Sequence, residues 1–529
     1  MIKKTIVFSF LLFISISMFS QVWKTYPFTP TGSQVSFSID EGRHTSEPME
    51  WWYTTGHVVG ATTGKHYSYM LTYFYYPYGS IDGFRILNIS DDDNEVFHSS
   101  TKFLTYATLA TDKLDIQAAI FGGGTETWKN KYSGTTILPF EYEINASSTN
   151  VTLDLDYNTV KNPLILSDDG YLLQGDTNYT YYYSQTGIDV TGNITYNGIT
   201  ESIIGSGWID RQYGTLNPSN GTEYEWFSLQ LSNNMDINLW NIFTSDDQVP
   251  DNERFKILAA YVDETTQYTN DDFELERLTY EYTPDNQKCY AQSWRLTSSV
   301  NNIDLIISTL YSNSEVQSPF RFYEGATNVT GTVNGVSVTG FGFTELLHSY
   351  EVPDLTISNE TIWNSSIPFE WEINNPDDGN PLYYNVAYST DNQTTYTALT
   401  TNITDETYVW NTNSFSNGDT FWLKVTANSI DGTLTGVTEK QFTYNATANV
   451  IDSKLVSLKI FPNPTFGTLN IEAENIQKIT IFNSNGKLVK RIDKDKIATN
   501  LNLKNLDKGV YFIKIYTDLG LVTEKIILK

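Results

Sequence analysis

Three segments of this sequence combine carboxyl groups with aromatic side chains. These are the functional groups needed to protonate an apolar molecule. They are EPMEWWYTTGHVVG at residues 47–60, GSGWIDRQYGT at 205–215 and RFYEGATNVTGTVNGVSVTGFGFTELLHSY at 321–350. Protonation of an isolated alkene requires a general acid, and the resulting carbocation requires a water-excluded pocket with aromatic faces. A carboxyl group can be this acid because burial raises its pKa.

All candidate site residues lie in these segments. The candidates for proton transfer are Asp210, Glu50, His57 and Glu345, and the candidates for substrate contact are Trp51, Tyr53, Trp208, Tyr213, Tyr323 and Glu324, the last also being a possible acid. In a pleated strand, alternate side chains share a face. Trp51 and Tyr53 therefore share one face. Trp208 and Asp210 do the same on their own strand, with Arg211 on the opposite face.

The sequence predicts neither a metal site nor a cofactor. No two of the five histidines have the H-x-x-x-H spacing of a zinc site. The single cysteine, Cys289, excludes an intrachain disulfide and a cysteine-based metal site. Acidic turns such as residues 91–93 lack the Asp-x-Asp-x-Asp-Gly order of a calcium loop. We therefore expect no metal and no cofactor.

The elements that position these segments are expected to be strands. Runs such as HYSYMLTYFYYPY at 66–78 are separated by turns such as Asn197-Gly198 and Asn334-Gly335. Short strands with turns at intervals of roughly ten residues, without a long stretch of helical period, are typical of sandwiches and barrels. The sequence therefore predicts an all-β protein.

Length and charge indicate several modules. A chain of 529 residues exceeds what one hydrophobic core usually organises. Residues 454–529 contain 13 basic and 7 acidic residues, although the whole chain has a net charge of −29. The strongly acidic body repels phosphate backbones and anionic lipids, so nucleic acid and membrane-surface partners are not expected.

The N-terminus has the pattern of a secretion signal. Lys3 and Lys4 precede an apolar run over residues 6–19, and the small residue Ser20 follows. The run is shorter than the span of about 20 residues that crosses a membrane, and no other run approaches that length. We predict a signal peptide at residues 1–20 and no membrane span after its removal.

The C-terminal segment resembles the type A C-terminal sorting domain of the type IX, or Por, secretion system of Bacteroidetes-type bacteria. The resemblance rests on LKIFPNPTFGTLNI at 458–471, ITIFNSNGKLVKRI at 479–492 and LNLKNLDKGVYFIKIYTDLGLVTEKIILK at 501–529. It implies that residues 454–529 direct the protein through the outer membrane, to the cell surface or the medium, with the type IX machinery as a partner.

The segment before this tail is rich in Asn, Thr and Ser, with aromatic residues spaced along alternating runs. YYNVAYSTDNQTTYTAL and TYVWNTNSFSNGDTFWLKVTA resemble a fibronectin type III or related immunoglobulin-like module. We expect a β-sandwich at residues 352–445, a type of domain that usually serves as a spacer or a binding unit.

The three acidic and aromatic segments, in this order, resemble the family of AttH-like proteins and carotenoid 1,2-hydratases. The shared patterns are E-W-W-Y-x-x-G-H, G-x-G-W-x-D-R-Q-Y-G and Y-E-G-A-x-x-V-x-G…G-F-x-E-L. The resemblance implies two tandem lipocalin-like, or calycin, β-barrels, expected at residues 35–195 and 196–350. It also implies an apolar ligand of isoprenoid, carotenoid or lipid-like character.

Packing explains several of these residues equally well. In lipocalin-type barrels a Trp of the first strand and an Arg commonly plug the closed end, so Trp52 and Arg211 can form such a plug. Asp210 can be the buried partner of that Arg, and His57 can be a neutral, hydrogen-bonded residue near a barrel mouth. Large aromatic residues such as Trp51 are core residues first.

Three functions follow from this sequence. The first is an enzyme that adds water to an alkene or cyclises it, and the second is a non-catalytic carrier of a hydrophobic small molecule. The third is a surface adhesion protein, which would gain support if the barrels were filled solidly with side chains. The carrier and the enzyme require the same pocket, so the sequence separates them poorly.

Overall fold

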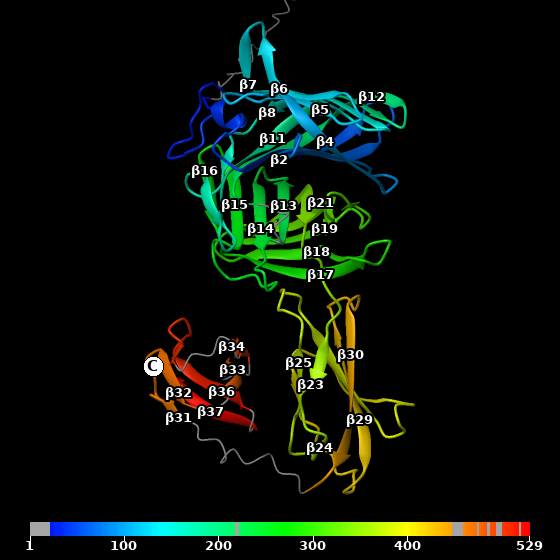
Figure 1. The fold of residues 1–529 in the computed structure, drawn as a ribbon, viewed down its shortest axis with the longest axis vertical. Coiled ribbons are helices and arrows are strands. Elements are labelled where there is room, and N and C mark those ends of the chain that lie inside the picture. Colours follow the sequence, from blue (N-terminus) through cyan, green and yellow to red (C-terminus); the bar gives the residue numbers. More distant parts are fainter. Residues whose placement is uncertain are drawn as a thin grey trace, which may run out of the picture.

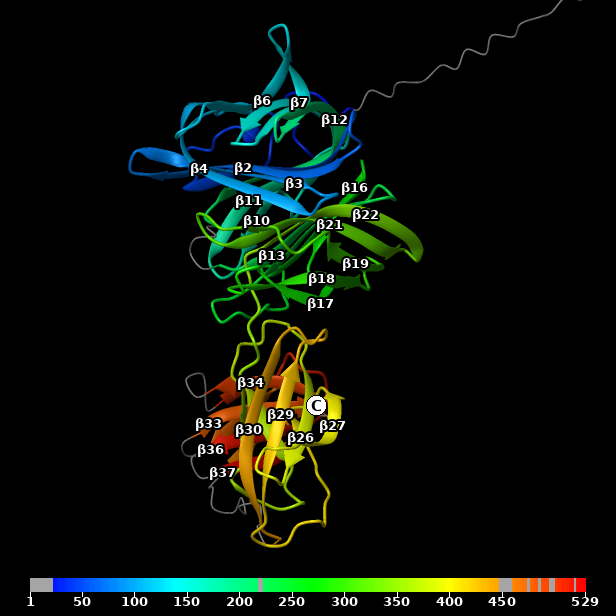
Figure 2. The same cartoon turned by 90° about the vertical axis from the view of Figure 1, so that its right-hand side faces the viewer.

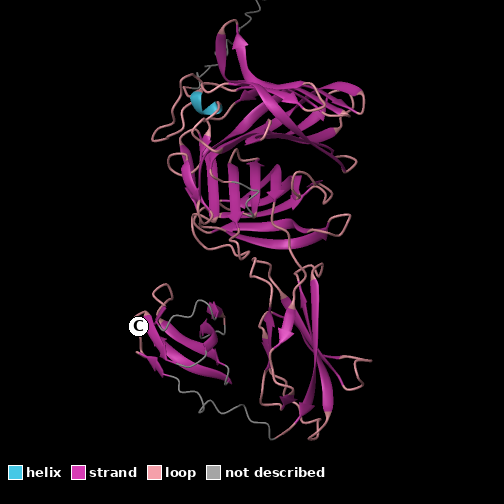
Figure 3. Ribbon diagram, viewed as in Figure 1, coloured by secondary structure: helices cyan, strands magenta, loops and turns pink. Residues whose placement is uncertain are grey.

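The computed structural model describes residues 22–216, 222–446, 459–472, 476–483, 487–493, 500–517 and 520–529. The expected signal peptide at 1–20 lies outside these residues. Strands make up almost all of the regular structure, which confirms the all-β fold, and a short 3₁₀-helix, η1 (Ile39–Glu41), precedes the first strand (Figure 3). In the described parts of the chain, no helix combines the length and the apolar character needed to cross a bilayer.

The first sheet forms a closed barrel. Ten strands, β1–β8, β11 and β12, form the ring, which closes where β11 pairs with both β8 and β12. The strands of this sheet are β1 (Met49–Gly60), β2 (His66–Tyr78), β3 (Ile81–Asp91), β4 (Val96–Leu109), β5 (Asp115–Ile120), β6 (Thr125–Ser133), β7 (Thr136–Ser147), β8 (Val151–Thr159), β9 (Leu164–Ile165), β10 (Tyr171–Gln174), β11 (Asn178–Tyr196) and β12 (Ile199–Gly214).

The boundary between the two barrels differs from the expected one. Residues 196–214 are expected in the second barrel, but β12 pairs with β11 from Ile199 to Gly214 and with β1 from Ile203 to Gly214. The turn Asn197-Gly198, with φ of 50° and 81°, makes β11 and β12 a hairpin, so the chain cannot change sheets there. The first sheet therefore extends to Gly214.

The second sheet is a curled, open barrel that lies directly below the first (Figure 1). Its strand order is β16-β15-β14-β13-β22-β21-β19-β18-β17, with β20 paired to β21. The bounds are β13 (Tyr224–Leu231), β14 (Asp236–Ile242), β15 (Lys256–Asp263), β16 (Thr266–Asn270), β17 (Glu274–Tyr282), β18 (Cys289–Ser298), β19 (Ile303–Thr309), β20 (Glu315–Val316), β21 (Phe322–Val333) and β22 (Val336–Leu346).

Side chains fill the interior of each barrel, and a third apolar cluster lies between the two sheets. The alternation of β1 explains this arrangement, because Trp52 points into the first barrel while Trp51 and Tyr53 point toward the second sheet. Strands β1, β13 and β14 are buried on both faces over most of their length. The space available to a ligand is therefore between the barrels.

Two β-sandwiches follow, and Figure 2 shows them below the second sheet. The first contains β23 (Leu355–Ile357), β24 (Ile362–Trp363), β25 (Phe369–Ile373), β26 (Tyr383–Ser389), β27 (Thr397–Ile403), β28 (Thr407–Tyr408), β29 (Thr420–Asn428) and β30 (Thr435–Tyr444). The second contains β31 (Lys459–Phe461), β32 (Thr468–Glu472), β33 (Ile476–Asn483), β34 (Leu488–Asp493), β35 (Asn500–Asn502), β36 (Gly509–Thr517) and β37 (Gly520–Leu528).

Candidate functional site

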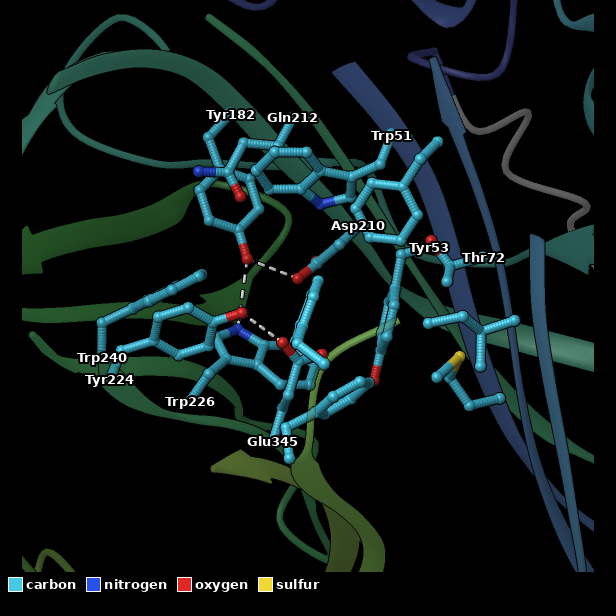
Figure 4. A pocket seen from close by; sticks show the side chains of 15 residues that line it. Trp51, Tyr53, Thr72, Tyr182, Asp210, Gln212, Tyr224, Trp226, Trp240 and Glu345 are labelled. Carbon is cyan, nitrogen blue, oxygen red and sulfur yellow. Dashed lines mark hydrogen bonds between the residues drawn. The ribbon is translucent and has the colours of Figure 1, made fainter. Parts of the chain in front are cut away.

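An apolar pocket lies between the two sheets, and both contribute to its walls (Figure 4). Aromatic residues dominate the lining, with Trp51, Tyr53, Phe74 and Tyr182 from the first sheet and Tyr224, Trp226, Trp240 and Phe322 from the second. Two carboxyl groups face it, Asp210 from β12 and Glu345 from β22, and no lining residue is a cation. The pocket thus brings together acids and aromatic faces from all three of the sequence segments.

Asp210 is fully buried and surrounded by hydrogen-bond donors. Its Oδ1 accepts hydrogen bonds from Ser184 Oγ at 2.6 Å and from Trp208 Nε1 at 2.7 Å. Its Oδ2 accepts one from the hydroxyl of Tyr182 and a longer one, at 3.4 Å, from Asn238 Nδ2. Burial raises the pKa of Asp210 to about 7, although the first three of these hydrogen bonds oppose the shift.

Tyr182 connects the two sheets at the centre of the pocket. Its oxygen accepts hydrogen bonds from Asn238 Nδ2 at 2.8 Å and Trp226 Nε1 at 3.2 Å, both on the second sheet. Because these donors occupy the lone pairs, the Tyr182 hydroxyl proton is directed to Asp210 (Figure 4). This network fixes the orientation of the Asp210 carboxyl group.

Glu345 lies directly opposite Glu324 in the β21–β22 ladder. The hydroxyl of Tyr224 donates to Glu345, and the hydroxyl of Tyr53 donates to Glu324 Oε1 at 2.8 Å. Burial raises the pKa of Glu345, and burial together with the charge of Glu345 raises that of Glu324 well above its usual range. Two buried carboxyl groups side by side cannot both ionise easily, so this pair holds a proton more firmly than an isolated glutamate does.

Glu50 belongs to a different cluster, at the end of the first barrel. It points to the interior face of β1 and forms ion pairs with Arg211 and with Arg43. Burial would raise its pKa, but Arg211, His44 and Arg43 outweigh burial and lower the pKa to about 2. The guanidinium of Arg211 lies 4.0 Å from the Trp52 ring. Glu50 is therefore an ionised structural group and is remote from the pocket.

The packing interpretation of the sequence placed Trp52, Arg211 and Asp210 in a plug at the barrel end. The structure agrees with it for Trp52 and Arg211 and contradicts it for Asp210. Trp52 and Arg211 do stack, but the partner of Arg211 is Glu50, and Asp210 faces the opposite side of the sheet. Side-chain alternation is the reason, since neighbours in a strand cannot share a face. Tyr213 lies on the plug side, where its ring stacks on His44 at 3.5 Å.

The remaining predicted residues have defined places outside the pocket lining. His57 is half-buried between the sheets, with its Nε2 3.1 Å from the carbonyl oxygen of Gly342, and desolvation lowers its pKa to about 4, which favours the neutral form. Tyr323 packs inside the second barrel and donates to the carbonyl oxygen of Tyr311 at 2.7 Å. Trp208 serves the pocket indirectly, as a donor to Asp210.

Sequence reasoning missed the second wall of the pocket. Tyr182 and Asn238 bind Asp210, and Tyr224, Trp226 and Trp240 line the cavity, yet none lies in the three segments that were singled out. One signal was available in the run YEWFSLQL at 224–231, where the apolar–polar alternation breaks at the adjacent aromatic residues Trp226 and Phe227. Neighbours in a strand point to opposite faces, so this pair indicates an apolar side chain on each face.

One group of possible metal ligands exists among the described residues, away from the pocket. Glu223, Asp247 and His348 place ligand atoms within 4.8 Å of one another. His348 Nδ1 lies 2.7 Å from Glu223, and its Nε2 lies 3.5 Å from Asp378 of the following domain. Burial lowers the pKa of His348, but Asp378 and Glu223 more than offset this and raise it to about 9. The imidazolium form accounts for this cluster as an ion-pair contact.

Comparisons with known proteins agree with this architecture. A model of the family described as AttH-like matches residues 29–350, and the secretion system C-terminal sorting domain matches residues 459–529. Kievitone hydratase of Fusarium solani subsp. phaseoli is 20% identical over 361 residues, which are 64% of this chain and 95% of that protein. A crystal structure assigned as AttH, from Nitrosomonas europaea, superposes with a TM-score of 0.51 at 20% identity, covering 61% of this chain and 99% of that chain.

Proposed function

Since the chain belongs to the AttH-like family, as the match over residues 29–350 shows, we propose that it is a secreted enzyme that adds water to an alkene. The substrate is an apolar molecule of isoprenoid, carotenoid or lipid-like character. The observation that carries this proposal is the pair Asp210 and Glu345, two buried carboxyl groups that face one aromatic pocket from different sheets. The relative named a hydratase supports water addition.

The chemistry requires one carboxyl group in each protonation state. The proton of a carboxylic acid adds to one alkene carbon and leaves a cation on the other, which the faces of Trp226 and Trp51 can stabilise. Water then attacks the cation, and its surplus proton passes to a carboxylate. The net change is addition of one water molecule, and transfer of one proton between the two carboxyl groups restores the enzyme.

The hydrogen bonds favour Glu345 as the acid and Asp210 as the base. Glu345 shares its surroundings with Glu324, so a proton remains on that pair. Asp210 receives three close donors, which suit a carboxylate. On sequence grounds Asp210 was also a candidate for the acid. The pH dependence of activity distinguishes Asp210 as the acid from Asp210 as the base.

Activity is expected to rise as the pH increases through about 7, because Asp210 must be ionised to take the proton of water. At higher pH the activity is expected to fall as the Glu324–Glu345 pair loses its proton. The measurement uses apolar alkenes in ¹⁸O-labelled water and follows the rate at which products with one labelled oxygen atom form. An activity that falls through pH 7 would assign the acid role to Asp210 instead.

Two other functions remain to be weighed against the enzyme. The filled barrels favour an adhesion protein, but adhesion gives no role to the two buried carboxyl groups that face an apolar pocket. A carrier uses the same pocket without turnover. Tight binding of an alkene without incorporation of labelled oxygen at any pH would favour the carrier.

The sorting domain places the protein outside the cell. Its match over residues 459–529 indicates passage through the type IX system to the cell surface or the medium. Removal of residues 454–529 is expected to leave the protein in the periplasm, because the machinery recognises this domain. Immunoblots of medium, surface and periplasmic fractions test this, with a deletion of the sandwich at 352–445 as the control. Normal export of the tail-less form would contradict it.

A further inference from the structure

The pocket between the barrels is too small for a whole apolar substrate. The volume of this pocket is about 30 Å³, which is room for roughly two water molecules at ~10–15 Å³ each. Pockets for ligands of drug size enclose about 300–1,000 Å³. The carboxyl groups can therefore reach only one end of a substrate, and the rest of it must lie elsewhere.

A larger groove adjoins the pocket. Its volume on the same measure is about 530 Å³. The first sheet provides one wall, with Tyr76, Tyr78, Phe84 and Phe103, and the second wall comes from residues such as Lys288 and Leu347. We call this space the outer groove.

Phe320 joins the two spaces. It lines both the pocket and the outer groove, and it lies in the short segment between β20 and β21. Phe84 of the outer groove also stacks on Phe74 of the pocket, with ring centroids 4.5 Å apart. The two cavities are therefore neighbours along the junction of the barrels, with Phe320 between them.

We propose that the outer groove binds the distal part of the substrate, an elongated apolar body that carries an acidic group. This proposal rests on the proposed function, because it takes the pocket as the place of reaction. Phe320 then separates the reacting end from the body of the molecule. The groove, and not the pocket, selects the substrate.

The aromatic wall indicates an apolar body. Tyr78 is 78% exposed and Phe103 is 51% exposed, although large apolar side chains are usually covered. Both belong to the lining of one groove, so together they offer a continuous apolar surface. An apolar chain lying on this wall would remove these rings from water, which favours binding.

The opposite wall indicates the acidic group. The other cations there already have carboxylate partners, since Arg321 pairs with Glu315 and Asp285, and His348 pairs with Glu223. Lys288 donates to Ser349 Oγ at 3.0 Å, and among the ion pairs of the described residues it has no carboxylate partner. The ε-ammonium of Lys288 is therefore the charge of this lining that can bind an acidic group.

Binding of cis-parinaric acid, a fluorescent fatty acid, and of its methyl ester tests the proposal in the full-length protein. Lys288→Gln is expected to weaken binding of the acid about tenfold and to leave the ester unchanged, because only the acid forms the charged contact. The double variant Tyr78→Ser with Phe103→Ser is expected to weaken both. Lys113→Gln, a lysine outside the groove lining, is the matched control.

The outcomes separate this proposal from the proposed function. Absence of binding to the wild-type protein, or equal binding by all variants, would overturn the outer groove as the site. Asp210→Asn is expected to bind both probes like the wild type. Binding that follows the groove variants in a protein without any hydration activity would support the groove and reject the enzyme.

Discussion

Asp210→Asn is expected to lower the rate of alkene hydration by about 10²–10⁴-fold, the usual contribution of a positioned acid or base. An amide has the shape of the carboxylate but cannot take a proton from water. The variant is expected to remain folded, because Asp210 has no cationic partner that would be left unpaired, and the nearby Arg211 pairs with Glu50. Steady-state rates on an alkene found by labelling, together with thermal melting, measure both effects.

Asp236→Asn is the matched control for this variant. Asp236 is also a fully buried aspartate, but it binds Lys161 at 2.6 Å and lies outside the lining of the pocket. Its substitution is expected to reduce stability and to leave the rate per folded molecule unchanged. A folded Asp210→Asn protein with full activity would refute the assignment of Asp210 to the reaction.

Arg211→Met is expected to lower the free energy of unfolding by about 3–5 kcal/mol, because it leaves the buried carboxylate of Glu50 without its main partner. Arg211 also donates to the carbonyl oxygen of Trp51 at 3.1 Å and stacks on Trp52, so packing at the barrel end is lost as well. Arg211 is the main group that opposes burial and lowers the pKa of Glu50, so without it Glu50 must either stay buried as a poorly paired charge or take up a proton, and both cost stability. Urea unfolding followed by tryptophan fluorescence measures the change.

The double variant Glu50→Gln with Arg211→Met is the control. Removal of both charges is expected to restore part of the lost stability, because no unpaired charge then remains buried. The pocket faces the other side of the sheet, so the rate per folded molecule is expected to stay within a few-fold of the wild type. If Arg211→Met were as stable as the wild type, Arg43 and His44 alone would be sufficient partners for the buried carboxylate of Glu50.

The sequence by itself determined the class of fold and the destination of the protein. Alternating runs with Asn-Gly turns specify strands and hairpins locally, since the turn geometry depends on neighbouring residues alone. The pleat also assigned Asp210 and Trp208 to one face and Arg211 to the other, as the structure shows. The sorting motifs are likewise contiguous, and their match at 459–529 confirms the secretion route.

The location of the site was decided by the tertiary structure. The period of two in a strand separates two faces but does not say which face meets the barrel interior and which meets another sheet. Trp51 was therefore a candidate both for substrate contact and for core packing, and the structure places it in the pocket lining while Trp52 stacks on Arg211. Likewise, Asp210 and Glu345 are 135 residues apart in the sequence, and they face the same pocket only because the two sheets pack against each other.

The protonation states were also decided by packing. Glu50 and Glu345 are both glutamates in strands rich in aromatic residues, and sequence gave them the same role. Arg211 and Arg43 lie against Glu50 and lower its pKa, whereas Glu345 is buried without a cation beside it, and burial raises its pKa. Burial and charged neighbours set a pKa, and both arise only when distant strands come together.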